Sequence, residues 1–310
     1  MVCENFYRFL EDNYGFSYVM TCLEITSFSS NRIFLLKTEY EKYIVRTIKK
    51  DTFNKDRLIF ACNFENRLNI DTGIAPCVYL SRNNLLVETY KEHYVIVTQY
   101  IPNEQINRST IKVVCSALSL LLVFLNYSMN NSKELLEIAN KKYEKYYVSN
   151  DIMRNLKNIL LKNEKMISKE YPKLDLFAKR FYVFFDNAFN QEMGECCVIH
   201  GDIHRENFLY SDNIAHHIID FDKVNIDLPY LDLGYFIFWS CFQDNNSKCH
   251  KIDQSMYLMI IKRICHKLDN TIKKDYLIFY VVAILLRNYK DIDKEILDII
   301  NDYIEKNFTD

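Results

Sequence analysis

The first hundred residues contain short runs of hydrophobic and β-branched positions that are typical of β-strands. Two such runs, 32–38 and 42–48, flank a polar turn and predict a hairpin. Apolar positions at near-helical spacing follow over 53–70, and two further β-rich runs come after them, at 85–90 and 94–100. The order predicts a small sheet whose strands are interrupted by one helix.

After Pro102 the pattern changes to long helices. Apolar residues recur at i, i+3 and i+4 in four segments: 111–127, 132–146, 151–169 and 174–189. A short β-rich stretch interrupts them, with a strand at 198–199 and a hairpin over 208–219, and helices resume near Leu231. The pattern predicts an α+β chain of two lobes, a β-rich lobe over 1–101 and a mainly helical lobe over 102–310.

Composition and charge exclude several classes of function. The chain is 49% hydrophobic and 26% charged, with a formal net charge of −2, and no stripe of Lys and Arg with interleaved aromatic residues occurs. We therefore expect no nucleic-acid partner. The most apolar run, 113–125, is too short to span a bilayer and reads as a buried helix. The N-terminal residues lack a basic region followed by an apolar core, so we expect a cytoplasmic protein without a membrane partner.

The ten cysteines are scattered and do not form a disulfide pattern. In a chain of this size we expect reduced thiols, most of them buried. A group near the C-terminus offers an alternative, since these residues could ligate a metal: Cys241, Cys249, His250, Cys265 and His266. Their spacing lacks the C-x2-C pairs of zinc sites, which favours the first interpretation.

The segment most informative about chemistry is 198–210, V-I-H-G-D-I-H-R-E-N-F-L-Y, which is followed after a short turn by I-D-F-D at 219–222. Four residues separate Asp202 from Asn207, as in the catalytic loop of kinases, and Asp220 falls where a second Mg²⁺ ligand is needed. Taken alone, each of these residues is typical of a turn or a helix cap. Together they favour phosphoryl transfer, in which one carboxylate accepts the proton of the attacking hydroxyl while oxygen ligands hold Mg²⁺ on the nucleotide phosphates.

These motifs resemble the aminoglycoside phosphotransferase and choline kinase superfamily. The segment D-L-P-Y-L-D-L at 227–233 is similar to the D-x-P-x-x-D-L segment of that superfamily. The I-D-F-D form is especially similar to the branch that contains bacterial spore-coat kinase-like proteins. The resemblance implies a two-lobed protein-kinase-like fold with a nucleotide-binding lobe at 1–101 and a catalytic, substrate-binding lobe at 102–310.

The resemblance also assigns roles in the second half of the chain. It makes Asp202 the catalytic base and makes Asn207 and Asp220 the Mg²⁺ ligands. Asp222 and His204 are expected near the metal or the substrate, with Asp222 as a further candidate metal residue. We include His200 and His204 among the candidate catalytic residues, with His200 supporting the loop; a structural role is at least as well founded for both, because a neutral imidazole can hold a loop through hydrogen bonds.

In the first half, the resemblance implies a phosphate-binding cation on the third strand, paired with a glutamate on the helix. These residues are Arg46 and Glu65, and Lys42 is an alternative cation because its even spacing from Arg46 puts both on one strand face. There is no glycine-rich loop. Its place is taken by residues that could donate hydrogen bonds to phosphate, Ser29, Ser30 and Asn31, although an ordinary turn is an equally good interpretation of them. A separate segment, Gln99, Tyr100 and Ile101, is implied as the hinge whose backbone binds adenine.

The function implied is transfer of the γ-phosphoryl group of ATP or GTP, with Mg²⁺, to a hydroxyl of a small molecule such as an aminoglycoside, an amino alcohol or a sugar. Gly201 stands where protein kinases carry Arg, and no D-F-G or A-P-E segment occurs, so a protein acceptor is disfavoured. Cationic acceptors would require acidic or aromatic walls. Candidates are Asp227, Tyr230, Trp239, Asp244 and Asp269. The alternative is a catalytically silent kinase-fold protein with a structural or spore-coat role.

Overall fold

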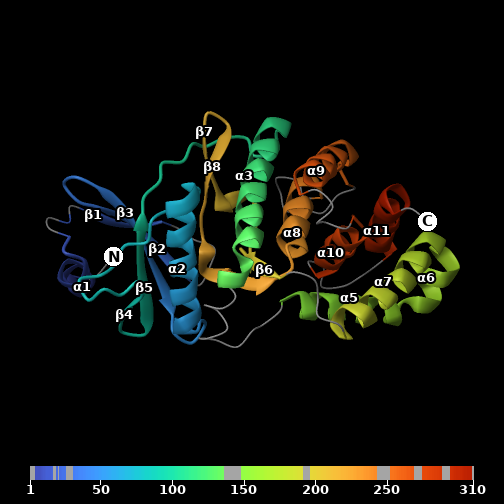
Figure 1. The fold of residues 1–310 in the computed structure, drawn as a ribbon, viewed down its shortest axis with the longest axis horizontal. Coiled ribbons are helices and arrows are strands. Elements are labelled where there is room, and N and C mark those ends of the chain that lie inside the picture. Colours follow the sequence, from blue (N-terminus) through green and yellow to red (C-terminus); the bar gives the residue numbers. More distant parts are fainter. Residues whose placement is uncertain are drawn as a thin grey trace. The chain divides into compact units, whose positions relative to one another are not determined.

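The computed structural model describes residues 4–16, 19, 21–25, 31–135, 148–190, 196–242, 252–268, 274–287 and 294–308. The chain divides into two compact units. The first comprises the described residues up to Ile106 together with Phe208–Lys223, and the second comprises the other described residues. Figure 1 gives the elements and their labels. The predicted α+β class is confirmed, with an antiparallel sheet in the N-terminal region and helices in the C-terminal part.

The first unit is built on a five-stranded antiparallel sheet in the order β1-β2-β3-β5-β4. The strands are β1 (Thr21–Ile25), β2 (Arg32–Lys37), β3 (Lys42–Lys49), β4 (Glu88–Tyr90) and β5 (His93–Gln99). The four β-rich runs seen in the sequence all contain strands. Strand β1, which forms an edge of the sheet and exposes four of its five residues, was not predicted.

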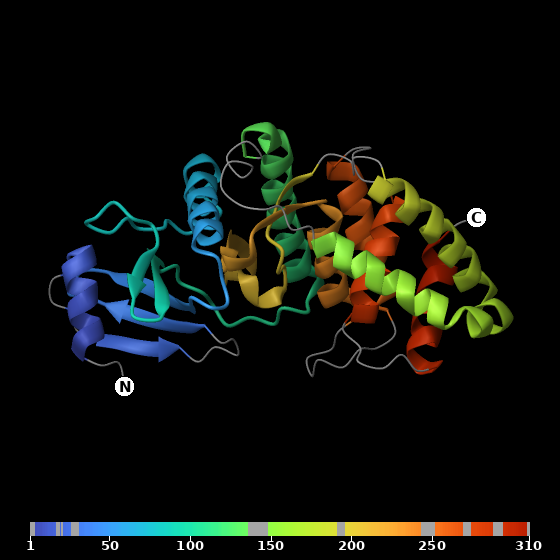
Figure 2. The ribbon, with the colours of Figure 1, turned by 90° about the horizontal axis from the view of Figure 1, so that it is seen from below.

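Two helices cover opposite faces of this sheet, as Figures 1 and 2 show. Helix α1 (Glu4–Tyr14) packs on the face that carries Val45, and helix α2 (Lys55–Thr72) packs on the face that carries Ile48. Side chains of a strand alternate between the two faces, so Arg46 lies on the α2 side. The predicted helix over 53–70 is confirmed as α2, and α1 was not predicted.

Both ends of α2 are fixed by its sequence. The side chain of Asn54 accepts hydrogen bonds from the backbone N–H groups of Asp56 and Arg57, which satisfies donors that the first helical turn leaves unpaired. Gly73 ends the helix with a φ of 72°, a left-handed conformation that glycine adopts without strain. The caps determine which residues α2 turns toward the sheet, Glu65 among them.

A later hairpin also belongs to the first unit. Strands β7 (Phe208–Ser211) and β8 (Ile214–Ile218) are joined through Asp212 and Asn213, whose φ values of 53° and 63° suit a tight hairpin turn. The N–H of Ile218 donates to the carbonyl of Ile74 at 2.8 Å, and the N–H of Glu104 donates to that of Tyr210 at 3.0 Å. The hairpin and the short helix η2 (Phe221–Lys223) after it are thereby held beside α2. The boundary expected between residues 101 and 102 stays a prediction.

The second unit is mainly helical. Its elements are α3 (Ile111–Asn130), α5 (Val148–Lys162), α6 (Glu164–Glu170), α7 (Pro172–Asn190), β6 (Cys197–Ile199), the short helix η1 (Arg205–Asn207), β9 (Asn225–Asp227), α8 (Tyr230–Cys241), α9 (Gln254–Lys267), α10 (Lys274–Arg287) and α11 (Lys294–Asn307). Strands β6 and β9 pair antiparallel. Most of the helix expected over 132–146 lies outside the described residues.

The prediction of a single helix over 151–169 is wrong, because the chain forms two helices there. Asn163 separates α5 from α6, with a φ of −103° and a ψ of 8°. Its side chain donates to the carbonyl of Ile159 at 2.9 Å, a local bond by which asparagine competes with the helical backbone.

Helix α3 is long and apolar enough to cross a membrane by length and composition alone. Ten of its twenty residues are buried within the protein, among them Leu118, Leu121 and Leu125. It packs against β6 and α9. The interpretation of 113–125 as a buried helix is confirmed.

Candidate active site

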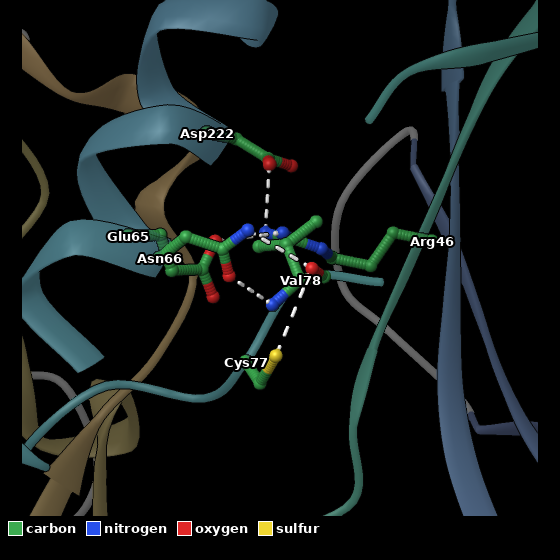
Figure 3. A network of polar contacts seen from close by, with 6 residues as sticks. All are labelled: Arg46, Glu65, Asn66, Cys77, Val78 and Asp222. Carbon is green, nitrogen blue, oxygen red and sulfur yellow. Dashed lines mark hydrogen bonds and ion pairs between the residues drawn. The ribbon is translucent and has the colours of Figure 1, made fainter. Parts of the chain in front are cut away.

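A buried cluster of three charged side chains joins three elements of the first unit (Figure 3). Arg46 extends from β3, and its Nη1 donates to Oδ1 of Asp222 at 2.8 Å, while its Nη2 donates to Oε2 of Glu65 at 3.1 Å. Glu65 comes from α2 and Asp222 from η2. The three residues are 6%, 1% and 6% exposed, in the order Arg46, Glu65, Asp222. Strand, helix and the I-D-F-D segment are therefore tied together through one guanidinium group.

The charges of this triad do not balance. Burial raises the pKa of Glu65 to about 7, although Arg46 acts in the opposite direction. Burial likewise raises the pKa of Asp222 to about 6, against Arg46, and the nearby charge of Asp220 adds to the increase. Burial also opposes the charge of Arg46, but the attraction of Asp222 and Glu65 outweighs it and raises the pKa of the guanidinium. With all three groups ionised the triad carries one net negative charge, so an additional cation nearby would be stabilised.

Helix α2 is held in place next to the triad by Asn66. Figure 3 shows its side chain against the backbone of Val78. The Oδ1 atom accepts from the N–H of Val78 at 2.5 Å and the Nδ2 atom donates to the carbonyl at 3.0 Å. Val78 in turn forms a β-bridge with Thr98 of β5. Asn66 therefore fixes the helical position that precedes it, Glu65, relative to the sheet.

The sheet face that carries Arg46 extends beyond α2. The register aligns Arg46 with Ile33 and Ile25 on the neighbouring strands, and aligns Ile44 with Leu35 and Leu23. Partners across an antiparallel sheet share a face. These apolar side chains are not fully buried, and Leu23 and Ile25 are 54% and 41% exposed. Lys42 lies on the same face, with its Nζ 5.3 Å from the ring centroid of Tyr100. This face combines apolar surface with positive charge.

Asp220 has a backbone conformation that is rare for a residue other than glycine. Its φ is 68°, in the left-handed region. Such strain persists only where the surroundings enforce it and is concentrated at functional sites. In the hairpin, Phe208 pairs with Ile218. At the open end of this hairpin, Asn207 therefore directly precedes strand β7, and Ile219 and Asp220 directly follow strand β8.

The loop of the H-G-D motif in the second unit is anchored by Asp232 in the first turn of α8. The carboxylate of Asp232 accepts from the N–H of His200 at 2.7 Å and from the N–H of Gly201 at 2.9 Å. Burial raises the pKa of Asp232 to about 7, and the two backbone bonds counteract it. Gly201 has a φ of 77°, which favours glycine. His200 is fully buried, with its ring centroid 6.5 Å from that of Phe124.

The rest of the loop is held by its own side chains. The Nδ2 of Asn207 donates to the carbonyl of Asp202 at 2.8 Å. The Nε of Arg205 donates to the carbonyl of Trp239 at 2.8 Å, in the last turns of α8, where helical carbonyls lack partners of their own. The ring centroid of His204 lies 6.0 Å from that of Trp239. Asp202 is only half-buried, so its position is fixed while its side chain remains reachable.

Comparisons with known proteins bear on the fold that carries these residues. The model of the Ecdysteroid kinase-like family matches residues 116–260. An amicoumacin kinase in complex with AMP-PNP, Ca²⁺ and Ami shares 10% sequence identity, with 99% of this chain and 93% of that chain covered and a TM-score of 0.64. A microcompartment-associated aminopropanol kinase shares 11% sequence identity, with 97% of this chain and 94% of that chain covered and a TM-score of 0.62. A choline kinase from Streptococcus pneumoniae shares 14% sequence identity, with 98% of this chain and 97% of that chain covered and a TM-score of 0.55. Aminoglycoside phosphotransferases also match. The fold is that of the aminoglycoside phosphotransferase and choline kinase superfamily. No curated protein sequence matches the chain.

The fold implied by the motifs is thus confirmed, and the spore-coat branch stays a prediction. Within the superfamily fold, the structure brings the expected pair Arg46 and Glu65 into contact and adds Asp222 as a third member. The motif residues of the second unit meet in a single loop: His200, Asp202, His204 and Asn207. The roles assigned to these residues stay predictions.

Other predicted residues are placed less informatively. Ser29 and Ser30 lie outside the described residues, and Asn31 directly precedes β2. Gln99 ends β5 with its N–H donating to the carbonyl of Cys77 at 2.8 Å, and Tyr100 and Ile101 follow the strand. Among the acidic and aromatic wall candidates, Asp227 and Tyr230 are buried, Trp239 is half-buried, and Asp244 and Asp269 lie outside the described residues.

The alternative metal site near the C-terminus is only partly covered by the structure, because Cys249 and His250 lie outside the described residues. In the part of the chain that is described, no three His, Cys, Asp or Glu side chains gather as a metal-binding group. Its eight described cysteines are free thiols.

Two contacts of the site had no clear signal in the sequence. Arg205 donates to the backbone carbonyl of Trp239, and because every residue has such a carbonyl, the sequence does not mark this partner. The bond from Arg46 to Asp222 spans 176 positions of the chain. The clamp of Asp232 on the loop was partly foreseeable, because this residue is the second aspartate of the D-x-P-x-x-D-L segment at 227–233.

Proposed function

We propose that the chain is a small-molecule kinase that transfers the γ-phosphoryl group of ATP or GTP to a hydroxyl group. The observation that carries this proposal is the triad, in which a buried strand arginine is held by the carboxylates of Glu65 and Asp222. It lies on a sheet face whose neighbouring members on β1 and β2, together with Ile44 of β3, are apolar and partly exposed. A guanidinium group beside an apolar surface suits a nucleotide, because it can bind phosphate oxygens while the base packs on the aliphatic side chains.

The donor atoms near the I-D-F-D segment fit a magnesium ion. Mg²⁺ binds oxygen ligands, usually one or two carboxylates together with substrate phosphates. Asp222 supplies a carboxylate from the triad, which has excess negative charge, and Asp220 supplies a second carboxylate close to it. Asn207 offers an amide oxygen as a further ligand, and its amide nitrogen is bonded to the Asp202 carbonyl. When bound, the ion supplies charge neutralisation on the phosphates. We assign Asn207, Asp220 and Asp222 to it.

In the proposed reaction the carboxylate of Asp202 accepts the proton of the acceptor hydroxyl. The hydroxyl oxygen forms a bond with the γ-phosphorus as the bond to the bridging oxygen of the nucleotide breaks, and the nucleoside diphosphate leaves. Asp202 is suited to this because its backbone is fixed at both ends of the loop, so little conformational entropy is lost on reaching the transition state. A cytoplasmic location belongs to the same proposal.

The nucleotide part of this proposal is tested by calorimetry with ATP and GTP, with and without Mg²⁺. We expect Mg²⁺-dependent binding that Asp220→Asn weakens by roughly tenfold or more, since a metal-ligand carboxylate is replaced by a neutral amide. Asp212→Asn is a matched control, because Asp212 is also an aspartate with a positive φ, in the turn of the same hairpin, and is exposed. It should leave binding unchanged. Metal-independent or absent binding would instead support a catalytically silent kinase-fold protein.

A further inference from the structure

Helix α8 turns one face toward the loop that carries Asp202. Two of its residues contact the loop: Asp232 binds the backbone of His200 and Gly201, and the carbonyl of Trp239 binds Arg205. Tyr235 lies between them, three positions after Asp232 and four before Trp239. Residues at this spacing share a helix face. The half-buried Tyr235 side chain therefore lies beside the middle of the loop.

An arginine from the neighbouring helix reaches the same place. Arg287, the last residue of α10, donates from Nη1 to the hydroxyl of Tyr235 at 2.6 Å. Arg287 is exposed, and among the described residues it forms no ion pair with Asp or Glu. Other arginines of the chain behave differently, for example Arg32, which binds both carboxylate oxygens of Glu24. The positive charge of Arg287 is held by a phenol and is left available to a ligand.

The close approach of the two helices depends on Gly234, the residue before Tyr235. A Cβ atom at this position would lie 2.7 Å from Cδ1 of Ile284 and 3.3 Å from Cβ of Tyr280, both on α10. Any side chain would push α10 away. Since Arg287 follows Ile284 by three residues, Gly234 permits the approach that brings the guanidinium to Tyr235.

The phenol and the guanidinium act together as hydrogen-bond donors. The Tyr235 oxygen accepts from Arg287, so its own O–H group remains free to donate in another direction. Burial, together with the charges of Asp202 and Asp232, raises the pKa of Tyr235, while Arg287 lowers it. The phenol therefore stays protonated at neutral pH. That Asp202 affects Tyr235 in this way agrees with the short distance implied by the helix face.

We propose that Tyr235 and Arg287 form an oxyanion-binding subsite for the acceptor, beside the catalytic Asp202. The acceptor is then a small alcohol with a carboxylate or phosphate group a few bonds from the hydroxyl that is phosphorylated. A guanidinium and a phenol that donate toward one region are the donors such a group requires. This inference rests on the proposed function, and it replaces the cationic acceptor for which acidic walls were expected with an anionic one.

Pairs of acceptors that differ only in the anionic group test this subsite. We would measure kcat/KM for threonine against 1-amino-2-propanol, serine against ethanolamine, and glycerate against ethylene glycol. A fourth pair, glycerol 3-phosphate against glycerol, separates a phosphate from a carboxylate. We expect the anionic member of at least one pair to be preferred by about tenfold or more, the effect of one charge-assisted hydrogen bond.

The variant Arg287→Gln should remove this preference. We expect the KM of the anionic acceptor to rise about tenfold, with kcat and the KM of the nucleotide nearly unchanged, and with the uncharged or cationic member unaffected. Arg263→Gln is a matched control, because Arg263 is also an exposed arginine that donates to a hydroxyl on another helix, that of Ser119, at 3.4 Å. It should leave both members of each pair unchanged.

Each other outcome decides against the subsite. A preference for the member without the anion, or one that survives Arg287→Gln, overturns it and leaves the proposed kinase intact. So does the absence of turnover for every pair while Mg²⁺-dependent nucleotide binding and slow nucleotide hydrolysis are present. If nucleotide is neither bound nor hydrolysed, the proposed function fails and the subsite fails with it.

Discussion

Buried carboxylates anchor both the arginine triad of the first unit and the H-G-D loop of the second unit, but they are stabilised in different ways. In the first unit Glu65 and Asp222 share the guanidinium of Arg46, so a side-chain charge compensates two others. In the second unit Asp232 forms no ion pair within the described residues and instead accepts two backbone N–H groups at the start of the loop that carries Asp202. Burial raises the pKa of all three acids.

The difference determines what each region tolerates. The triad depends on a balance of charges, so removing its single cation leaves two buried acids side by side. The anchor that Asp232 provides for the loop depends on the geometry of its two acceptor oxygens. A side chain of the same shape that keeps one acceptor oxygen should therefore still hold the loop in part. Charge loss is therefore expected to cost more in the triad than in the anchor.

The largest effect is expected for Arg46→Met. It leaves Glu65 and Asp222 without a cation, and breaking a buried ion pair from one side typically costs about 3 to 5 kcal/mol of the free energy of unfolding. Urea unfolding at pH 8 measures this. Arg32→Met is the control, because the Arg32–Glu24 pair is exposed and should be worth less than about 1 kcal/mol. Equal losses in the two variants would show that the triad is no more important than a surface pair.

The pH dependence sharpens the same comparison. The pKa values of Glu65 and Asp222, about 7 and about 6, already lie above the unfolded values near 4. Without Arg46, which lowers both, they rise further. The folded state then binds more protons than the unfolded state above about pH 4, so the free energy of unfolding falls as pH rises. The loss in Arg46→Met should thus be smaller at pH 5.5 than at pH 8. A loss that is the same at both values would contradict the assignment of the triad as buried charges.

A smaller effect is expected for Asp232→Asn. The amide keeps one acceptor oxygen but presents its NH₂ group to the second buried N–H, which costs about 1 to 3 kcal/mol of unfolding free energy. Because the anchored residues precede Asp202, kcat should fall as well, while nucleotide affinity changes little. Asp175→Asn serves as control, since Asp175 forms an i,i+4 pair with the exposed Lys179. If Asp232→Asn matched this control in stability and kcat, the anchor would have no function.

Much of this site was predictable because its chemistry is compressed into one segment. The spacing of Asp202, Asn207 and Asp220 and the hairpin between the last two are local features, and the strands around Arg46 follow from alternating side chains. The left-handed conformation of Asp220 was not predictable in the same way. No property of an aspartate signals a φ of 68°, which is imposed by the packing around it.

Two of the elements that were missed are strands that are short or lie at a sheet edge. Strand β9 has three residues, and β1 exposes four of its five, so neither shows a pattern that distinguishes a strand from a loop. Helix α1 carried a usable signal, since Phe6 and Leu10 are spaced by one helical turn and are both buried. The subsite at Tyr235 and Arg287 was also missed, because helices α8 and α10 meet only in the folded chain.

The most direct test of the central claim is the turnover of Asp202→Asn with a true acceptor. The substitution keeps the size and hydrogen bonding of the side chain and removes the base. General-base assistance typically supplies two to four powers of ten, so kcat should fall by roughly 10² to 10⁴ while the affinity for Mg²⁺-nucleotide is nearly unchanged. The backbone anchors of the loop do not involve this carboxylate, so the fold should be preserved. Turnover within a factor of about three of the wild type, far below that range, would contradict phosphoryl transfer by way of Asp202.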